Sequence, residues 1–124
     1  MILVDTSVWV QHLRSGDPIL AGELGAGRVL AHPFVIGELA CGTLRNRREV
    51  IDLLGRLPAV PTATQAEALD FLERHALMGR GIGFVDVHLL ASAALAAPAR
   101  LWTRDRRLAA VAAALNLAHQ PGRR

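Results

Sequence analysis

The feature that most constrains this chain is the alternation of short β-rich runs with longer helical patterns. Ile2-Leu3-Val4 is a run of this kind that ends at Asp5, and Leu101-Trp102-Thr103 is a second one that ends shortly before Asp105. Residues 28–31 form another short apolar run. Strands separated by helices predict an α/β fold with a mostly parallel sheet. A chain of 124 residues has the length of a single domain.

Turn and capping residues divide the rest of the chain into helices. Thr6 or Ser7 can cap a helix that runs to about Arg14, and Gly16-Asp17-Pro18 ends it and starts the next helix. Further helices are predicted, with approximate ends, over residues 33–44, 47–57, 65–77, 86–98 and 106–115. We expect one domain over residues 1–121 and a loose basic tail over residues 122–124.

The composition indicates an ordinary globular protein with a modest positive charge. The net charge is +3, and all 14 basic residues are Arg. Arginine suits bidentate contact with phosphate, but this net charge alone is too small to establish nucleic-acid binding. A lone cysteine, Cys41, has no internal partner for a disulfide, and we expect it to be a small core residue.

No segment has the pattern of a membrane span or a signal peptide. The apolar N-terminus lacks a basic region and is interrupted by Asp5. The apolar stretch 84–99 contains Asp86, His88 and Pro98, and it is shorter than the roughly 20 residues that a spanning helix needs. The sequence therefore predicts a cytoplasmic protein that does not enter the membrane.

Isolated carboxylates interrupt three apolar segments of the chain. Asp5, Glu38 and Asp86 are each the only charged residue in their segment. Carboxylates are rarely buried without a partner, and a divalent cation placed among several of them removes their mutual repulsion. Asp5 and Asp105 both follow predicted strands, and sites in α/β folds lie at the carboxyl ends of strands. Glu38 and Asp86 would project from helices toward the same place.

Each acid also has a structural interpretation. Asp5 and Asp86 could cap helices, and Glu38 could be a solvated helix position. Asp105 could be a capping residue in a surface cluster with the neighbouring arginines. The occurrence of all four together, two of them at matching strand ends, favours a shared site. His88 follows Asp86 by two residues and so points to another helix face, which favours packing over a ligand role.

Other chemistries lack their motifs. The five histidines and the single cysteine do not have the spacing of a zinc site. A phosphoryl-accepting role for Asp5 is disfavoured, because position 7 is Ser7 and the chain has no lysine to hold a phosphate. The chain contains no phosphate-binding glycine motif and no serine-hydrolase motif.

Four short motifs, in order, resemble those of PIN-domain proteins, and in particular of the VapC toxins. They cover essentially the whole chain: Met1-Ile2-Leu3-Val4-Asp5-Thr6-Ser7-Val8-Trp9, Ile36-Gly37-Glu38-Leu39, Gly83-Phe84-Val85-Asp86-Val87-His88-Leu89-Leu90-Ala91 and Leu101-Trp102-Thr103-Arg104-Asp105. Each motif is weak alone, and the ordered set is specific. One departure is His88, where many relatives have an apolar residue.

The resemblance implies a central parallel sheet flanked by helices, with one or two Mg²⁺ or Mn²⁺ ions. Asp5 and Asp86 would be the main ligands, Glu38 would complete the site, and Asp105 would bind or orient a second ion through water. Small hydroxyl residues would support these carboxylates from behind. The matching positions are Thr6, Ser7 and Thr103.

The resemblance also implies an activity and partners. Family members are endoribonucleases that act on structured RNA such as tRNA or rRNA, form homodimers and are silenced by a small antitoxin, VapB. Arginines near the site could hold RNA phosphates, namely Arg80, Arg104, Arg106 and Arg107. A non-catalytic PIN-like binding module and a nuclease that acts on DNA are the alternatives. An exposed apolar groove along residues 33–44 and 51–57 would suit an antitoxin.

Overall fold

The structure, a computed structural model, describes residues 1–121. The loose tail predicted for residues 122–124 lies outside the described residues. A three-stranded parallel sheet forms the centre, with β1 (Ile2–Val4) between β2 (Val29–Leu30) and β3 (Arg100–Trp102). The prediction of an α/β fold with a parallel sheet is confirmed.

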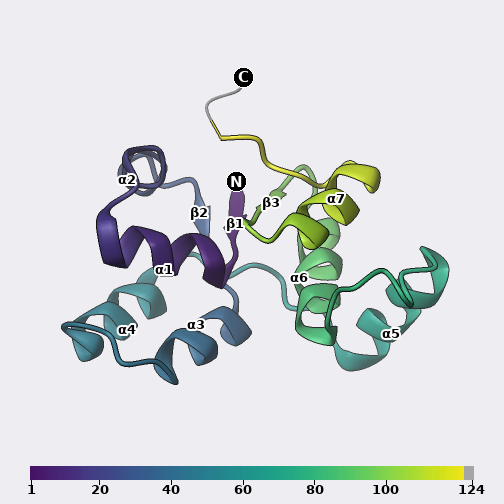
Figure 1. Cartoon of the computed structure of the whole chain (residues 1–124), viewed down its shortest axis with the longest axis horizontal. Helices are drawn as coiled ribbons and strands as arrows, with labels where there is room; N and C mark the ends of the chain where they lie inside the picture. The colour runs from purple at the N-terminus through teal and green to yellow at the C-terminus, as the bar shows by residue number, and fades with distance from the viewer. Residues whose placement is uncertain (122–124) are drawn as a thin grey trace.

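Helices flank this sheet on two sides. Within residues 1–121 they are α1 (Thr6–Ser15), α2 (Pro18–Gly25), α3 (Pro33–Ala40), α4 (Arg47–Arg56), α5 (Gln65–Arg74), α6 (Phe84–Leu95) and α7 (Arg106–Ala114). Figure 1 shows α1 to α4 on one side of the strands and α5 to α7 on the other. Isolated parallel bridges extend the sheet. One joins Ala31 to Ala59, and another joins Leu101 to Ala118.

Capping residues explain where several helices begin. The side chain of Asp5 caps α1, instead of the predicted Thr6 or Ser7. The side chain of Asp17 caps α2, and Asp105 caps α7 by accepting a hydrogen bond from the Leu108 N–H at 2.9 Å. These side chains satisfy backbone N–H groups that a helix leaves unpaired in its first turn.

Several helix boundaries differ from the prediction, and two of them change where a singled-out residue lies. The helix α6 begins at Phe84, so Asp86 lies inside its first turn and Gly83 occupies the N-cap position. The helix α3 ends at Ala40, four residues earlier than predicted, and Cys41 is its C-cap. Cys41 is therefore exposed in the turn that follows, and the prediction of a buried Cys41 is wrong.

The core surrounds the sheet and includes the central helix α6 as well as buried residues of the other helices, such as Trp9, Leu39 and Leu108. All of β1 is buried, and every residue of α6 from Val87 to Ala93 is buried. A helix that is apolar on every face suits this position because neighbours cover it on all sides. Within the described residues, no helix is both long and apolar enough to cross a membrane.

Candidate active site

Asp5 is the most enclosed of the candidate acids. It follows β1 directly, and only 7% of its surface is exposed. One carboxylate oxygen, Oδ1, accepts a hydrogen bond from the Thr6 N–H at 2.8 Å. The other, Oδ2, accepts from the Ser7 hydroxyl at 2.8 Å and from the Thr103 hydroxyl at 2.7 Å. These neutral donors replace the water that a buried carboxylate would otherwise need.

Pairing of the two strands brings Asp105 beside Asp5. The Asp5 N–H donates to the Trp102 carbonyl at 2.9 Å, so the loop after β3 begins next to Asp5. In that loop, the Asp105 N–H donates to the Thr103 hydroxyl oxygen at 3.0 Å. Parallel neighbours thus place two strand-end carboxylates at one edge of the sheet, as the order of the strands requires.

Glu38 and Asp86 approach this edge from two helices. Glu38 is exposed on α3, and its Oε1 accepts a hydrogen bond from the Thr6 hydroxyl at 2.6 Å. Asp86 is partly buried, and its Oδ2 accepts from the Gly83 N–H at 3.0 Å. The hydroxyl of Thr6 therefore contacts Glu38, whereas those of Ser7 and Thr103 contact Asp5.

The electrostatics of Asp86 show that the acids share one region. Burial raises the pKa of Asp86 above its ordinary value, and the hydrogen bond from Gly83 acts in the opposite direction. The negative charges of Asp5, Asp105 and Glu38 raise this pKa further. Charges influence one another in this way only at short range. The structure therefore brings together all the carboxylates that the sequence singled out.

The donor set fits a hard divalent cation. Within residues 1–121, no three His, Cys, Asp or Glu side chains converge closely enough to enclose an ion by themselves. Mg²⁺ does not require such a cage, because it keeps several waters and usually takes one or two carboxylates from the protein. All the grouped ligands offer oxygen, which Mg²⁺ and Mn²⁺ prefer.

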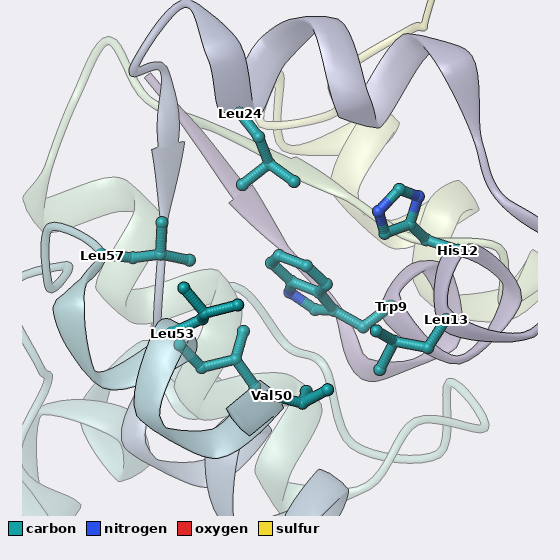
Figure 2. Close-up of a pocket in the computed structure, with 8 residues that line it drawn as sticks. Trp9, His12, Leu13, Leu24, Val50, Leu53 and Leu57 are labelled. Carbon is teal, nitrogen blue, oxygen red and sulfur yellow. The ribbon is translucent and has the colours of Figure 1, made fainter. Parts of the chain in front are cut away.

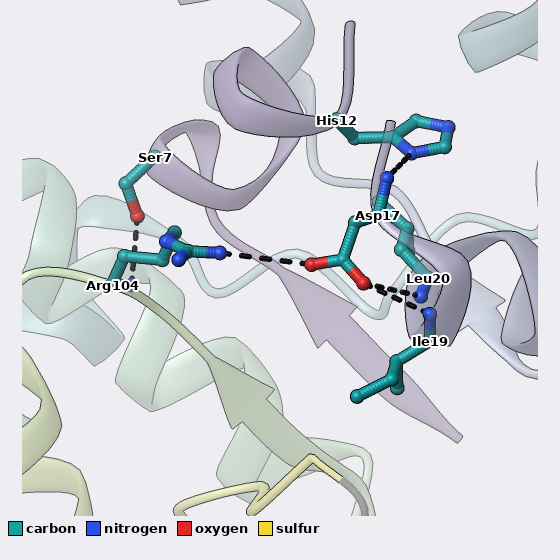
Figure 3. A network of polar contacts seen from close by, with 6 residues as sticks. All are labelled: Ser7, His12, Asp17, Ile19, Leu20 and Arg104. Atoms are coloured by element: carbon teal, nitrogen blue, oxygen red, sulfur yellow. Dashed lines mark hydrogen bonds and ion pairs between the residues drawn. The ribbon is translucent and has the colours of Figure 1, made fainter. Parts of the chain in front are cut away.

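Arg104 connects the site to the turn between α1 and α2 (Figure 3). Its N–H donates to the Ser7 hydroxyl at 2.9 Å, and its Nη1 lies 3.6 Å from Asp17 Oδ2. The Asp17 N–H in turn donates to His12 Nδ1 at 3.0 Å. Sequence reasoning missed Asp17, whose only visible signal was its place before a proline at a helix start.

The other candidate arginines are exposed, and none of them forms an ion pair with a described residue. They are Arg80, Arg106 and Arg107. Arg107 lies across Gly81 in the loop before Asp86, where an added Cβ would stand 2.7 Å from Arg107 Cδ. Gly81 also has a φ of +79°, which favours glycine. The glycine thus permits an arginine of α7 to lie on the loop that leads to α6.

Two buried histidines belong to the helices that carry Glu38 and Asp86. His88 is 4% exposed and packs between aromatic rings, as the sequence favoured. His32 is fully buried at the N-cap of α3, where its Nδ1 accepts from the Phe34 N–H at 3.0 Å. Burial, together with the nearby His88, lowers the pKa of His32 to about 4. Its role was not visible in the sequence, because a histidine before a proline has no distinctive pattern.

The chain matches a known protein family over most of its length. The model of the PIN domain family matches residues 2–114. Because this match covers most of the chain, the protein belongs to the PIN domain family.

Individual proteins are also similar to this chain. The chain is 51% identical over 113 residues to "Ribonuclease VapC32" from two strains of Mycobacterium tuberculosis, CDC 1551 / Oshkosh and H37Rv, covering 91% of each sequence. Among solved structures, "Crystal Structure of FitAcB from Neisseria gonorrhoeae" is similar with a TM-score of 0.63. That likeness covers 95% of both chains at 20% identity and supports the fold alone.

Proposed function

We propose that this protein is a metal-dependent endoribonuclease and the toxin of a toxin–antitoxin pair. The observation that carries the proposal is the group of carboxylates at the sheet edge, joined by the hydroxyls of Thr6 and Thr103. Burial raises the pKa of Asp86, and the charges of the other acids raise it further. Support for RNA as the substrate comes from the relatives, which are named ribonucleases. The substrate is a structured RNA such as tRNA or rRNA, and the protein acts in the cytoplasm.

In this proposal, Asp5 and Asp86 hold one or two Mg²⁺ or Mn²⁺ ions, Glu38 completes the site and Asp105 acts through water. The metal supplies an activated water and stabilises charge on the attacked phosphate. Ser7 and Thr103 donate hydrogen bonds to Asp5, which fixes its orientation. No side chain needs to act as a nucleophile.

Phosphates of the RNA are held by exposed arginines near the acids. These are Arg80, Arg104, Arg106 and Arg107. A phosphate contact releases counterions from the nucleic acid, so its loss lowers the salt dependence of binding. Replacing Arg106 and Arg107 with Gln should reduce the slope of log affinity against log salt. An unchanged slope would remove these two residues from the RNA contact.

Cleavage of a total RNA pool by the purified protein tests the proposal. Fragments should form with Mg²⁺ or Mn²⁺, and excess EDTA or the Asp5→Asn substitution should abolish them. Asp52→Asn is a matched control, because Asp52 is an exposed carboxylate on α4 and is not among the grouped acids. Cleavage that persists in EDTA and in Asp5→Asn would refute metal-dependent hydrolysis at this site.

The alternatives give different results in the same assay. A non-catalytic binding module would bind RNA but cut nothing with any metal, and the retention of all four acids argues against it. A DNA nuclease would cut single-stranded DNA in preference to RNA of the same sequence. Parallel reactions on the two substrates separate these possibilities, because metal-activated water does not itself select the sugar.

An antitoxin of the VapB type is the proposed partner. A pocket of about 330 Å³ lies between α1, the end of α2 and α4, and apolar side chains line most of it (Figure 2). Trp9 forms one wall, and its buried indole N–H has no hydrogen-bond partner within the described residues. Of the two segments predicted for a groove, 51–57 lines this pocket, and Pro33 and Ile36 line an adjacent one.

An amphipathic helix of the antitoxin suits these pockets, because its apolar face would cover side chains that are now exposed, such as Leu53. Leu53→Glu should prevent co-purification with a co-expressed antitoxin and leave RNA cleavage by the free toxin intact. Retention of the complex by Leu53→Glu would place the antitoxin elsewhere. We also propose a homodimer, which sedimentation of the purified toxin tests.

A further inference from the structure

Two exposed phenylalanines stand beside the acids. The chain has three Phe residues, and Phe34 and Phe84 are 40% and 42% exposed. Phe34 lies in the first turn of α3, and Phe84 begins α6. These are the helices that carry Glu38 and Asp86. Large aromatic side chains gain much from burial, so two exposed rings at one place are a candidate contact surface.

A buried histidine joins the two rings. The ring of His88 lies 4.9 Å from that of Phe34 and 4.7 Å from that of Phe84, centroid to centroid. The interplanar angles are 73° and 77°, so both contacts have edge-to-face geometry. The ring of Phe34 also lies 5.1 Å from the ring of the buried His32, centroid to centroid. The exposed rings are therefore held in place from behind by buried imidazoles.

The energetics of this arrangement are unusual for packing alone. His88 Nδ1 and His32 Nε2 are buried and have no hydrogen-bond partner within the described residues. Unpaired buried polar atoms are unfavourable, and an apolar side chain at position 88 would avoid one of them. What His88 provides is a flat, rigid ring that contacts both phenylalanines. We refer to Phe34, Phe84 and His88 together as the aromatic platform.

The aromatic platform adjoins the acidic site. Phe34 precedes Glu38 by one helical turn, which places the two side chains on the same face of α3. Phe84 and Asp86 both lie in the first turn of α6, on different faces of the helix. The acids would repel a bare phosphate, whereas a nucleobase is neutral and can approach the rings. Exposed arginines such as Arg107 are available for the phosphates.

We propose that the aromatic platform is a stacking site for an unpaired nucleobase of the RNA substrate, next to the phosphate that is cut. Phe34 and Phe84 contact the base, and His88 is a positioning residue. This inference rests on the proposed ribonuclease function. A base inside a duplex cannot stack on these side chains, so the platform selects single-stranded loops or bases displaced from a stack.

Fluorescence of the Phe84→Trp variant tests the contact directly. Trp9 and Trp102 are each only 4% exposed, so a tryptophan at position 84 would report on solvent and ligand at the platform. We expect a single-stranded oligoribonucleotide to quench this emission, with Ca²⁺ in place of Mg²⁺. An abasic ribose-phosphate oligomer of the same length carries the same charge and should not quench it.

Affinities of leucine variants provide the second measurement. Phe34→Leu and Phe84→Leu keep apolar volume but remove the aromatic face. Each should weaken binding of the base-bearing oligomer about fivefold or more, since one stacked base contributes about 1–3 kcal/mol. His88→Leu should cause a smaller loss in the same direction. Affinity for the abasic oligomer should not change in any of them, which a general folding defect would not reproduce.

Phe71→Leu is the matched control. Phe71 lies on α5, and not on α3 or α6, and its ring packs against that of His75 at the end of the same helix. RNA cleavage by the wild type, together with equal affinity of all variants for the base-bearing oligomer, would overturn the platform and leave the proposed function standing. Absence of both RNA binding and cleavage in the wild type would refute both. Dissociation of a dimer by Phe34→Leu and Phe84→Leu, without base-dependent quenching, would instead assign the rings to contact between two copies and overturn the proposal.

Discussion

At the end of β1, Asp5 is buried and accepts three hydrogen bonds, whereas Asp86 in the first turn of α6 is partly buried and accepts one. We call Asp5, Ser7 and Thr103 the strand corner, and Asp86 with Glu38 the helix corner. The donors of the strand corner come from the start of α1, directly after β1, and from the loop after β3. The helix corner depends on two separate helices, and burial, together with repulsion from the other acids, raises the pKa of Asp86.

The difference indicates how the two corners contribute to one site. The three hydrogen bonds hold the Asp5 carboxylate in one orientation without a cation. Asp86 has one such donor, the Gly83 N–H, and its charge is opposed by burial and by the other acids. A cation would therefore stabilise mainly the helix corner, while the strand corner provides a fixed ligand. The predictions below separate these two contributions.

The largest expected effect is the loss of cleavage in Asp5→Asn and in Asp86→Asn, by more than about a hundredfold in each. Their stabilities should differ. Asp5→Asn places an amide NH₂ where hydroxyl or N–H groups donate, which should cost about 1–3 kcal/mol of unfolding free energy. Asp86→Asn keeps an acceptor for the Gly83 N–H and removes repulsion, so its metal-free stability should be unchanged or higher.

Urea unfolding in EDTA measures these stabilities, and Asp52→Asn controls for loss of a surface charge. Equal destabilisation by Asp5→Asn and Asp86→Asn would contradict the distinction between the corners.

The second effect concerns the pH dependence of stability and the buried His32. His32 has a pKa lowered to about 4 in the folded protein, compared with an ordinary value of 6.5. Stability from neutral His32 is fully present above about pH 6.5 and falls as the pH decreases toward 4, because the unfolded chain binds the proton more readily. The maximum loss is about 3 kcal/mol.

His32→Asn isolates this contribution, because asparagine can also cap α3 but does not titrate. Its unfolding free energy, measured from pH 7 to pH 4, should depend on pH less steeply than that of the wild type. Identical slopes in the two proteins would show that His32 does not produce the acid sensitivity.

A smaller effect compares hydroxyl groups of the two corners. Thr103→Val removes a donor to the buried Asp5 and should lower kcat about tenfold, as loss of a ligand's supporting hydrogen bond commonly does. Thr6→Val removes the hydroxyl contact to the exposed Glu38 and should have a weaker effect. Steady-state cleavage rates at saturating Mg²⁺ test this order. A greater loss in Thr6→Val would place the fixed ligand at the helix corner.

The smallest effect concerns the ion pair that joins the strand corner to α2. Asp17→Asn keeps the oxygen that caps α2 and removes the charge opposite Arg104. Because this pair is partly exposed and 3.6 Å long, stability should change by less than about 1 kcal/mol. Thermal unfolding at low and high salt measures it. A larger, salt-dependent loss of stability would show that the ion pair, and not the hydroxyls of Ser7 and Thr103, mainly stabilises the loop after β3.

Much of the strand corner could be predicted from the sequence. An acid directly after a β-rich run must lie at a strand end, and parallel pairing of two such strands brings their ends together. The positions of Asp5 and Asp105 could therefore be predicted from the order of the strands alone. The family motifs likewise named Ser7 and Thr103, although the sequence did not reveal that both donate to the same oxygen of Asp5.

The helix corner was harder to predict because it depends on tertiary packing. Asp86 was expected to begin its helix, but Gly83 takes the cap position and turns Asp86 into the first turn. His88 also packs against Phe34, which lies 54 positions earlier on another helix, and no periodicity indicates this contact. The early end of α3, which exposes Cys41, follows from local turn geometry that apolar composition does not specify.

The central claim is that the two corners form one cation site, and calorimetric titration with Mn²⁺ tests it most directly. Wild-type protein and Asp52→Asn should bind Mn²⁺ with the same affinity, and Asp5→Asn and Asp86→Asn should each lose most of that binding. Binding to the wild type that neither substitution affects, or no binding to the wild type at all, would contradict the account.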